Sequence, residues 1–103
     1  MMKNMKISDA VIDMIENNKF IPFFEDDEII IIPKLDHEFC NQVLKYAKKK
    51  ESKGYGWYKR ELECNRVAQA LEDDNRFEKF IHVTGRKAYR YLGDSRGKYG
   101  NKK

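Results

Sequence analysis

Residues 75–93 read NRFEKFIHVTGRKAYRYLG, and this stretch decides the predicted fold. The side chains predicted to face the core recur at the three- and four-residue spacing of a helix: Phe77, Phe80, Ile81, Thr84, Ala88, Tyr91 and Leu92. Asn75 and Glu78 have the spacing of a capping box, and Gly93 stands where a glycine often ends a helix. The pattern predicts a helix that fills the stretch, although Gly85 in its middle costs about 1 kcal/mol relative to Ala.

The basic side chains of this predicted helix fall together on the side opposite its apolar face. At about 100° per residue they form one ridge: Arg76, Lys79, Arg86, Lys87 and Arg90. The chain after Gly93 adds further bases: Arg96, Lys98, Lys102 and Lys103. A row of fixed cations is typical of proteins that bind a polyanion, because each neutralised phosphate releases condensed counterions.

The rest of the chain predicts three more helices and one hairpin. Apolar residues at helical spacing predict helices from Ile7 to about Asn17, from Asp36 to the lysine-rich segment KKKESK of residues 48–53, and from roughly Trp57 to Leu71. Ser8 and Asp36 are the predicted N-caps of the first two. Two apolar, β-rich runs, KFIPFF and IIII, flank the acidic tetrad EDDE and predict the hairpin.

The fold class that follows is mainly α (α+β), with about four helices and one small β-hairpin. We expect a single compact domain over residues 1–93 and a mobile basic tail over residues 94–103.

Charge is divided unevenly between the two parts of the chain. From Met1 to Leu44 there are four Lys against nine Asp or Glu, a net charge of −5. From Lys45 to Lys103 there are seventeen Lys or Arg against eight acids, a net charge of +9. The basic part is therefore the part expected to meet a polyanionic partner.

Aromatic rings lie among these bases, in the segment KGYGWYKR and in the tail. Rings offer stacking platforms for bases while Arg and Lys hold phosphates, a mixture that favours RNA over duplex DNA. The predicted function is a small non-catalytic nucleic-acid-binding protein. The residues predicted to bind nucleic acid are Trp57, Tyr58, Lys59, Arg60, Lys79, Arg86, Lys87, Arg90, Arg96, Lys98 and Tyr99.

Two other interpretations remain open. A DNA-binding variant reads RVAQALEDDNRFEKFIHV as two helices around a short turn, but acids occupy that turn. The alternative from another class is a phage-type inhibitor or regulator that binds a host enzyme such as a nuclease or a toxin. The acidic tetrad Glu25–Glu28 would then serve as a contact for that enzyme, or for the basic part of a second copy in a homo-oligomer.

Other chemistry has little support in the sequence. The Cys and His residues, namely His37, Cys40, Cys64 and His82, lack the usual spacing of metal ligands, and no nucleophile–base pair or phosphate-binding glycine loop is present. We therefore expect no metal, no cofactor and no catalytic residue. No apolar run approaches the length of a membrane span, and the start lacks a secretory signal, so the expected location is the cytoplasm of a bacterial host cell.

Overall fold

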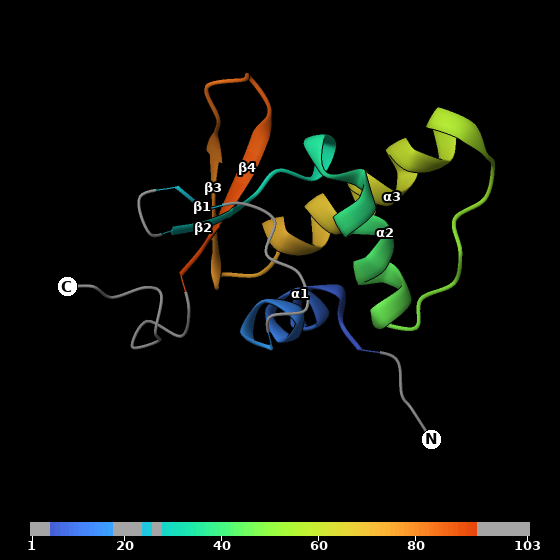
Figure 1. Ribbon diagram of the computed structural model, residues 1–103, viewed down its shortest axis with the longest axis horizontal. Helices are drawn as coiled ribbons and strands as arrows, with labels where there is room; N and C mark the ends of the chain where they lie inside the picture. Colours follow the sequence, from blue (N-terminus) through green and yellow to red (C-terminus); the bar gives the residue numbers. More distant parts are fainter. Residues whose placement is uncertain (1–4, 18–23, 26–27, 93–103) are drawn as a thin grey trace.

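The computed structural model describes residues 5–17, 24–25 and 28–92 (Figure 1). Its elements, in chain order, are α1 (Ile7–Glu16), β1 (Phe24–Glu25), β2 (Glu28–Ile31), the 3₁₀ turn η1 (Pro33–Leu35), α2 (His37–Tyr46), α3 (Gly56–Glu72), β3 (Phe77–Ile81) and β4 (Lys87–Tyr91). The strands form an antiparallel sheet in the order β1-β2-β4-β3. The α+β class is confirmed, as are the first three predicted helices and the hairpin of β1 and β2.

The helix predicted over residues 75–92 is wrong, because this stretch forms the hairpin of β3 and β4. The two strands are joined by a turn over residues 82–86, in which His82 N donates to Arg86 O at 2.9 Å. Gly85 has a φ of +87°, a left-handed conformation that glycine adopts without steric cost. The residue that looked like a costly mid-helix glycine is thus the residue that makes the turn.

The run of isoleucines in β2 explains why the second hairpin is needed. Ile29 and Ile31 point into the main core, whereas Ile30 and Ile32 pack with Ala88 on the other face of the sheet. A strand that is buried on both faces lies inside a sheet and needs a partner on each edge. β1 pairs with one edge of β2, and β4 supplies the other, with Ile31 opposite Tyr89.

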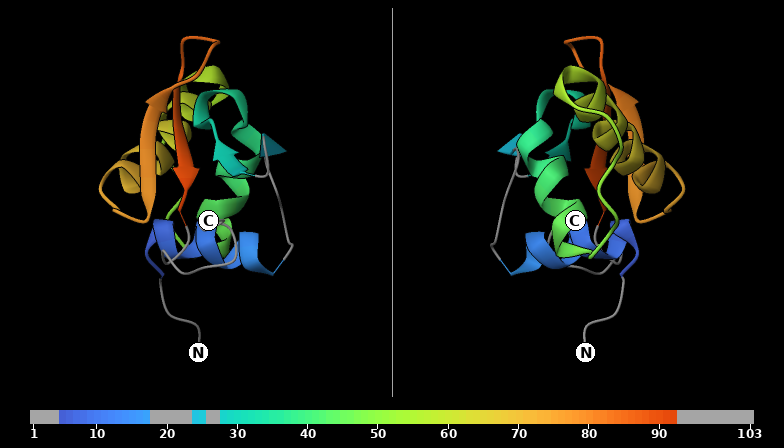
Figure 2. Two further views of the ribbon diagram at one scale, coloured as in Figure 1. Left: turned by 90° about the vertical axis from the view of Figure 1, so that its left-hand side faces the viewer. Right: turned by 90° about the vertical axis from the view of Figure 1, so that its right-hand side faces the viewer.

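The helices cover one face of the sheet, and α1 lies at the side of the molecule away from the β3–β4 turn (Figures 1 and 2). The core between the layers joins apolar side chains from all three helices to the inner face of the sheet, among them Val11, Ile15, Phe39, Val43, Val67, Leu71, Tyr89 and Tyr91. Cys40 and Cys64 are free thiols buried in this core. None of the helices in the described ranges combines the length and the apolar composition needed to cross a membrane.

One of the predicted helix caps is found. Asp36 is the N-cap residue of α2, as predicted. α1 begins at Ile7, so the predicted cap Ser8 lies inside its first turn and is buried there. The capping box of Asn75 and Glu78 is replaced by a turn in which Asp74 Oδ1 accepts a hydrogen bond from Arg76 N at 2.9 Å.

Candidate nucleic-acid interface

Strand geometry separates the bases that were predicted to share one helix face. Successive side chains of a strand point to opposite faces of the sheet, so alternate residues share a face. Lys79 and Lys87 share the face of Tyr89, which packs against the helices. Arg90 points to the other face, opposite Glu78 and Ile30. The predicted continuous ridge is therefore wrong.

Arg90 is held by two carboxylates on that outer face. Its Nε donates to Glu28 at 2.8 Å, one of its terminal nitrogens donates to Glu78 at 2.7 Å, and its guanidinium lies 4.4 Å from the centre of the Phe80 ring. Burial would lower the pKa of Arg90, but the hydrogen bonds to Glu28 and Glu78 outweigh it, and the pKa is raised. Arg90 thus joins β4 to β2 and β3, and its guanidinium is occupied by these contacts and does not form part of the candidate interface.

Lys79 is also paired. Its Nζ lies 3.0 Å from Glu72 at the end of α3, and this contact links β3 to the helix layer. Arg76 is committed as well, because it binds Asp74 and Asp9, each at 2.7 Å. Of the five bases of the predicted ridge, Arg86 and Lys87 are the two that form no ion pair within the described residues.

Arg86 and Lys87 stand at the exposed β3–β4 turn, next to Val83, which is 94% exposed. Within the described part of the chain, no carboxylate lies within ion-pair distance of either base. The turn therefore presents two unmatched positive charges beside an apolar tip.

The start of α3 presents a second exposed group of side chains. Tyr55 is 87% exposed and Trp57 is 74% exposed, and the Trp57 and Tyr58 rings meet edge to face at 6.4 Å between centroids. Arg60 is exposed one turn further along and, among the described residues, has no ion-pair partner. Lys59, in contrast, is paired with Glu51. Trp57, which a core role would have buried, is thus available for contact.

The loop that leads into α3 depends on glycine. Gly54 has a φ of +91°, and a Cβ added there would lie 2.7 Å from Cδ2 of the Tyr58 ring. Gly56, the first residue of the helix, has a φ of +66°. These glycines let the chain turn tightly over Tyr58 and expose the first turn of the helix.

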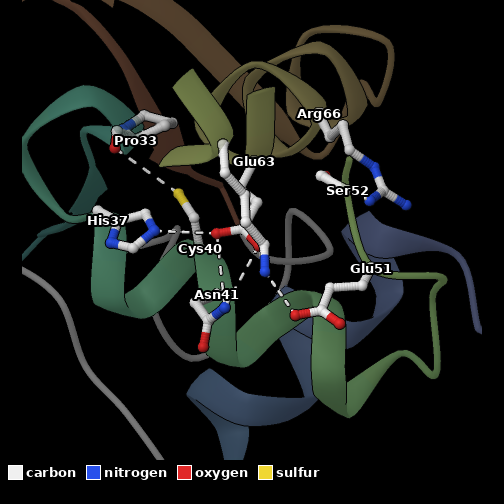
Figure 3. A network of polar contacts seen from close by, with 9 residues as sticks. Pro33, His37, Cys40, Asn41, Glu51, Ser52, Glu63 and Arg66 are labelled. Atoms are coloured by element: carbon white, nitrogen blue, oxygen red, sulfur yellow. Dashed lines mark hydrogen bonds and ion pairs between the residues drawn. The ribbon is translucent and has the colours of Figure 1, made fainter. Parts of the chain in front are cut away.

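A partly buried polar network joins the middle of α3 to α2 and to the loop before α3 (Figure 3). The Glu63 side chain, only 3% exposed, lies with Oε1 at 2.9 Å from His37 Nε2 and with both carboxylate oxygens at 3.4 Å from Asn41 Nδ2. Arg66 donates to Lys50 O and to Ser52 Oγ, each at 2.9 Å. Sequence reasoning missed Glu63, because a glutamate among exposed helix positions gives no signal of burial.

Lys34 of η1 completes this arrangement by pairing with Glu61 of α3. η1 lies between the β3–β4 turn and the start of α3, and all three segments occupy the side of the molecule away from α1 (Figures 1 and 2). We call this surface the basic edge, and it comprises Tyr55, Trp57, Tyr58, Arg60, Val83, Arg86 and Lys87.

Three predicted interface residues, Arg96, Lys98 and Tyr99, lie outside the described residues, as does the whole predicted tail. Within the described ranges, no three His, Cys, Asp or Glu side chains are grouped so as to hold a metal ion. Comparison with known protein families, with curated proteins and with solved structures found no match.

Proposed function

We propose that the protein binds nucleic acid through the basic edge and prefers duplex DNA. The observation that carries the proposal is that unmatched bases stand at both ends of one edge, Arg60 at the start of α3 and Arg86 with Lys87 at the β3–β4 turn. Two such points contact phosphates on either side of a groove while the first turn of the helix enters it. The proposal includes no catalysis, and it places the protein in the cytoplasm of a bacterial cell.

The arrangement of the elements supports duplex DNA over the single-stranded RNA that the sequence favoured. The order α1, β2, α2, α3 and the β3–β4 hairpin, whose second strand pairs with β2, is the arrangement of winged helix-turn-helix domains, and β1 adds a further strand at the outer edge of β2. In helix-turn-helix proteins, the second helix of the pair presents its N-terminal residues to base edges in the major groove. The likeness concerns only the arrangement of the elements, and an arrangement does not by itself imply a function. The exposed side chains at the start of α3 supply the groups that would contact DNA.

Each exposed group has a role in this proposal. Arg86 and Lys87 hold the sugar–phosphate backbone, which gives affinity without reading sequence. Arg60 is placed to contact a guanine edge or a phosphate, since Arg suits both. Trp57 and Tyr58 offer apolar surface to thymine methyl groups or to sugars.

Charge reversal at the turn tests the proposal. The double variant Arg86→Glu/Lys87→Glu is compared with Lys6→Glu/Lys45→Glu, which changes the net charge equally at exposed positions beside α1 and at the end of α2. Binding of a labelled DNA duplex and of a single-stranded RNA is followed by fluorescence anisotropy over a range of salt concentrations. We expect a loss of affinity for the duplex of more than about ten-fold in the turn variant, and a salt slope shallower by about 2.

The control variant should bind within about two-fold of the parent, because phosphate contacts act over short range at physiological salt. Equal losses in the two variants, or a parent that binds neither nucleic acid, would refute the proposal. Tighter binding of the RNA than of the duplex would refute the preference for duplex DNA. Trp57 and Tyr58 would then be interpreted as stacking platforms for the bases of single-stranded RNA.

A protein partner is the second candidate, and the exposure of Val83 and Trp57 favours it. Exposed apolar and aromatic side chains on one surface are typical of protein-binding sites. A host enzyme inhibited at this edge would be retained by the parent from a nuclease-treated lysate and lost with Trp57→Ala/Val83→Ser. Its retention by the variant would exclude this surface as the contact.

A further inference from the structure

A cleft of ≈ 390 Å³ lies between α3 and the start of β4, with η1 contributing to its wall. Three of its lining side chains are bases, Lys34, Arg86 and Lys87. Two more, Asn65 and Gln69, are amides on exposed positions of α3. The lining thus combines cations with amide donors, drawn from three separate segments of the chain.

The positive charge of this cleft is not cancelled from within. Its one lining carboxylate among the described residues, Glu72, is already matched by Lys79 Nζ at 3.0 Å and by the Tyr89 hydroxyl at 3.2 Å. The hydrogen bond from Lys79, with that from Tyr89, lowers the pKa of Glu72, so it remains ionised and paired. Lys87 also attracts the Glu72 carboxylate without forming an ion pair with it, and Lys34 is tied to Glu61. Three lining bases thus face one lining carboxylate among the described residues, and the cleft keeps an excess of positive charge.

The donors suit a tetrahedral oxyanion. An Arg guanidinium binds two phosphate oxygens in parallel, a Lys ammonium acts as a point charge, and amide N–H groups add neutral donors. Gln69 Nε2 donates to Asp73 Oδ1 at 3.1 Å along the helix, so its amide is free to turn toward a ligand by exchanging one exposed hydrogen bond. The volume falls in the range of sites that hold small molecules.

We infer that this cleft is a seat for a phosphoryl group, held by Arg86 of the β3–β4 turn, by Lys87 of β4, and by Gln69 and Asn65 of α3. The inference rests on the proposed function where the phosphoryl group belongs to a nucleic-acid backbone. In that case the seat places one backbone phosphate between the helix and the β3–β4 turn. A free phosphorylated small molecule is the other source of the same chemistry.

The test introduces a negative charge into the cleft without touching the basic edge. Gln69→Glu does this in α3, and Gln42→Glu makes the same chemical change on α2 as a matched control. Both replacements keep a good helix former, so the fold is preserved. Amide signals of the parent and both variants are followed by NMR during titration with inorganic phosphate, and with sodium chloride at the same ionic strength.

We expect saturable shifts at residues 69, 86 and 87 of the parent with phosphate and not with chloride. The dissociation constant should rise about ten-fold or more in Gln69→Glu and stay within about two-fold in Gln42→Glu, because a carboxylate beside the seat repels the ligand. Shifts that do not saturate, or an equal affinity for phosphate in all three proteins, would refute the proposal that this cleft holds a phosphoryl group.

Binding of the duplex to the same variants separates the two sources. If Gln69→Glu also weakens duplex binding, the seat holds a backbone phosphate. If phosphate titrates the seat while the parent binds no nucleic acid, the seat stands with a free phosphorylated ligand and the proposed function fails. If the duplex binds all three proteins equally and phosphate does not saturate, the proposed function stands and the seat is wrong.

Discussion

At the scale of single residues, the glycines with positive φ differ in their surroundings. A Cβ at Gly54 would lie 2.7 Å from the Tyr58 ring, whereas nothing lies within 4 Å of a Cβ at Gly85. Gly85→Ala should therefore cost about 1 kcal/mol through backbone strain alone. Gly54→Ala should cost about 2 kcal/mol, because the new methyl group also displaces the ring. Urea denaturation of the two variants measures the difference.

Gly56→Ala is the nearby control, with a φ of +66° and open space around its Cβ position. It should resemble Gly85→Ala in cost. Equal destabilisation by all three substitutions would mean that the Tyr58 ring does not pack over Gly54. The start of α3 would then be less firmly placed than the basic edge requires.

At the scale of elements, β4 serves two purposes on its two faces. Arg90 binds Glu28 and Glu78 across the sheet, while Arg86 at the preceding turn has no ion-pair partner among the described residues. Arg90→Gln should lower the free energy of unfolding by about 1 kcal/mol and leave duplex affinity within about two-fold. Arg86→Gln should do the reverse, weakening binding several-fold with little change in stability.

Thermal unfolding and anisotropy on the same two preparations provide the measurements. Because both substitutions remove one positive charge, net charge cannot explain a difference between them. A larger loss of duplex affinity in Arg90→Gln than in Arg86→Gln would mean that Arg90 contacts the duplex. This result would support the predicted basic ridge and contradict the structural role given to the Arg90 ion pairs.

The corner between α3 and β3 carries a pH-dependent contact to α1. Hydrogen bonds from the Arg76 side chain lower the pKa of Asp74 well below its ordinary value of 3.8, and Arg76 also reaches Asp9. A carboxylate with a lowered folded pKa stabilises the fold above its unfolded pKa and loses that contribution as the pH falls toward the folded value. The stability that Asp74 contributes is therefore present near neutral pH and disappears in strong acid.

Asp74→Asn should be less stable than the parent by about 1–3 kcal/mol at about pH 7, since a charged hydrogen-bond acceptor is lost. The difference should shrink as the pH is lowered from about 4 toward about 2. Urea denaturation at several pH values measures this gap. A gap that stays constant across the acid range would show that the ionisation of Asp74 does not contribute.

The sequence predicted the three helices and the first hairpin because their signals are local. It failed at residues 75–92, where the spacing of Phe77, Phe80 and Ile81 fits a helix as well as a strand. Pairing of β4 with β2 decides between them, and the paired residues Ile31 and Tyr89 are 58 residues apart in the chain, so no local pattern reports this pairing. The four isoleucines of residues 29–32 held the missing signal, since a doubly buried strand needs a second neighbour.

At the scale of the whole molecule, the candidate site joins segments that are distant in the chain. The sequence named Trp57, Tyr58, Arg60, Arg86 and Lys87, but as parts of separate features. Folding brings the start of α3 and the β3–β4 turn to one side of the molecule (Figure 1). It also places Arg90, Lys79 and Lys59 in ion pairs. Ion pairing depends on tertiary geometry, so the sequence could identify candidate bases but not the unmatched ones.

The protein's only tryptophan makes the basic edge directly observable. Because Trp57 is 74% exposed in the folded protein, its fluorescence should change little on unfolding in urea. Addition of the DNA duplex should quench it or shift it to shorter wavelength, since contact with bases or sugars removes the ring from water. The change should follow the binding curve measured by anisotropy and need higher DNA concentrations in Arg86→Glu/Lys87→Glu. Saturating DNA that leaves the emission unaltered would place Trp57 outside the interface, and contact would then be confined to the β3–β4 turn.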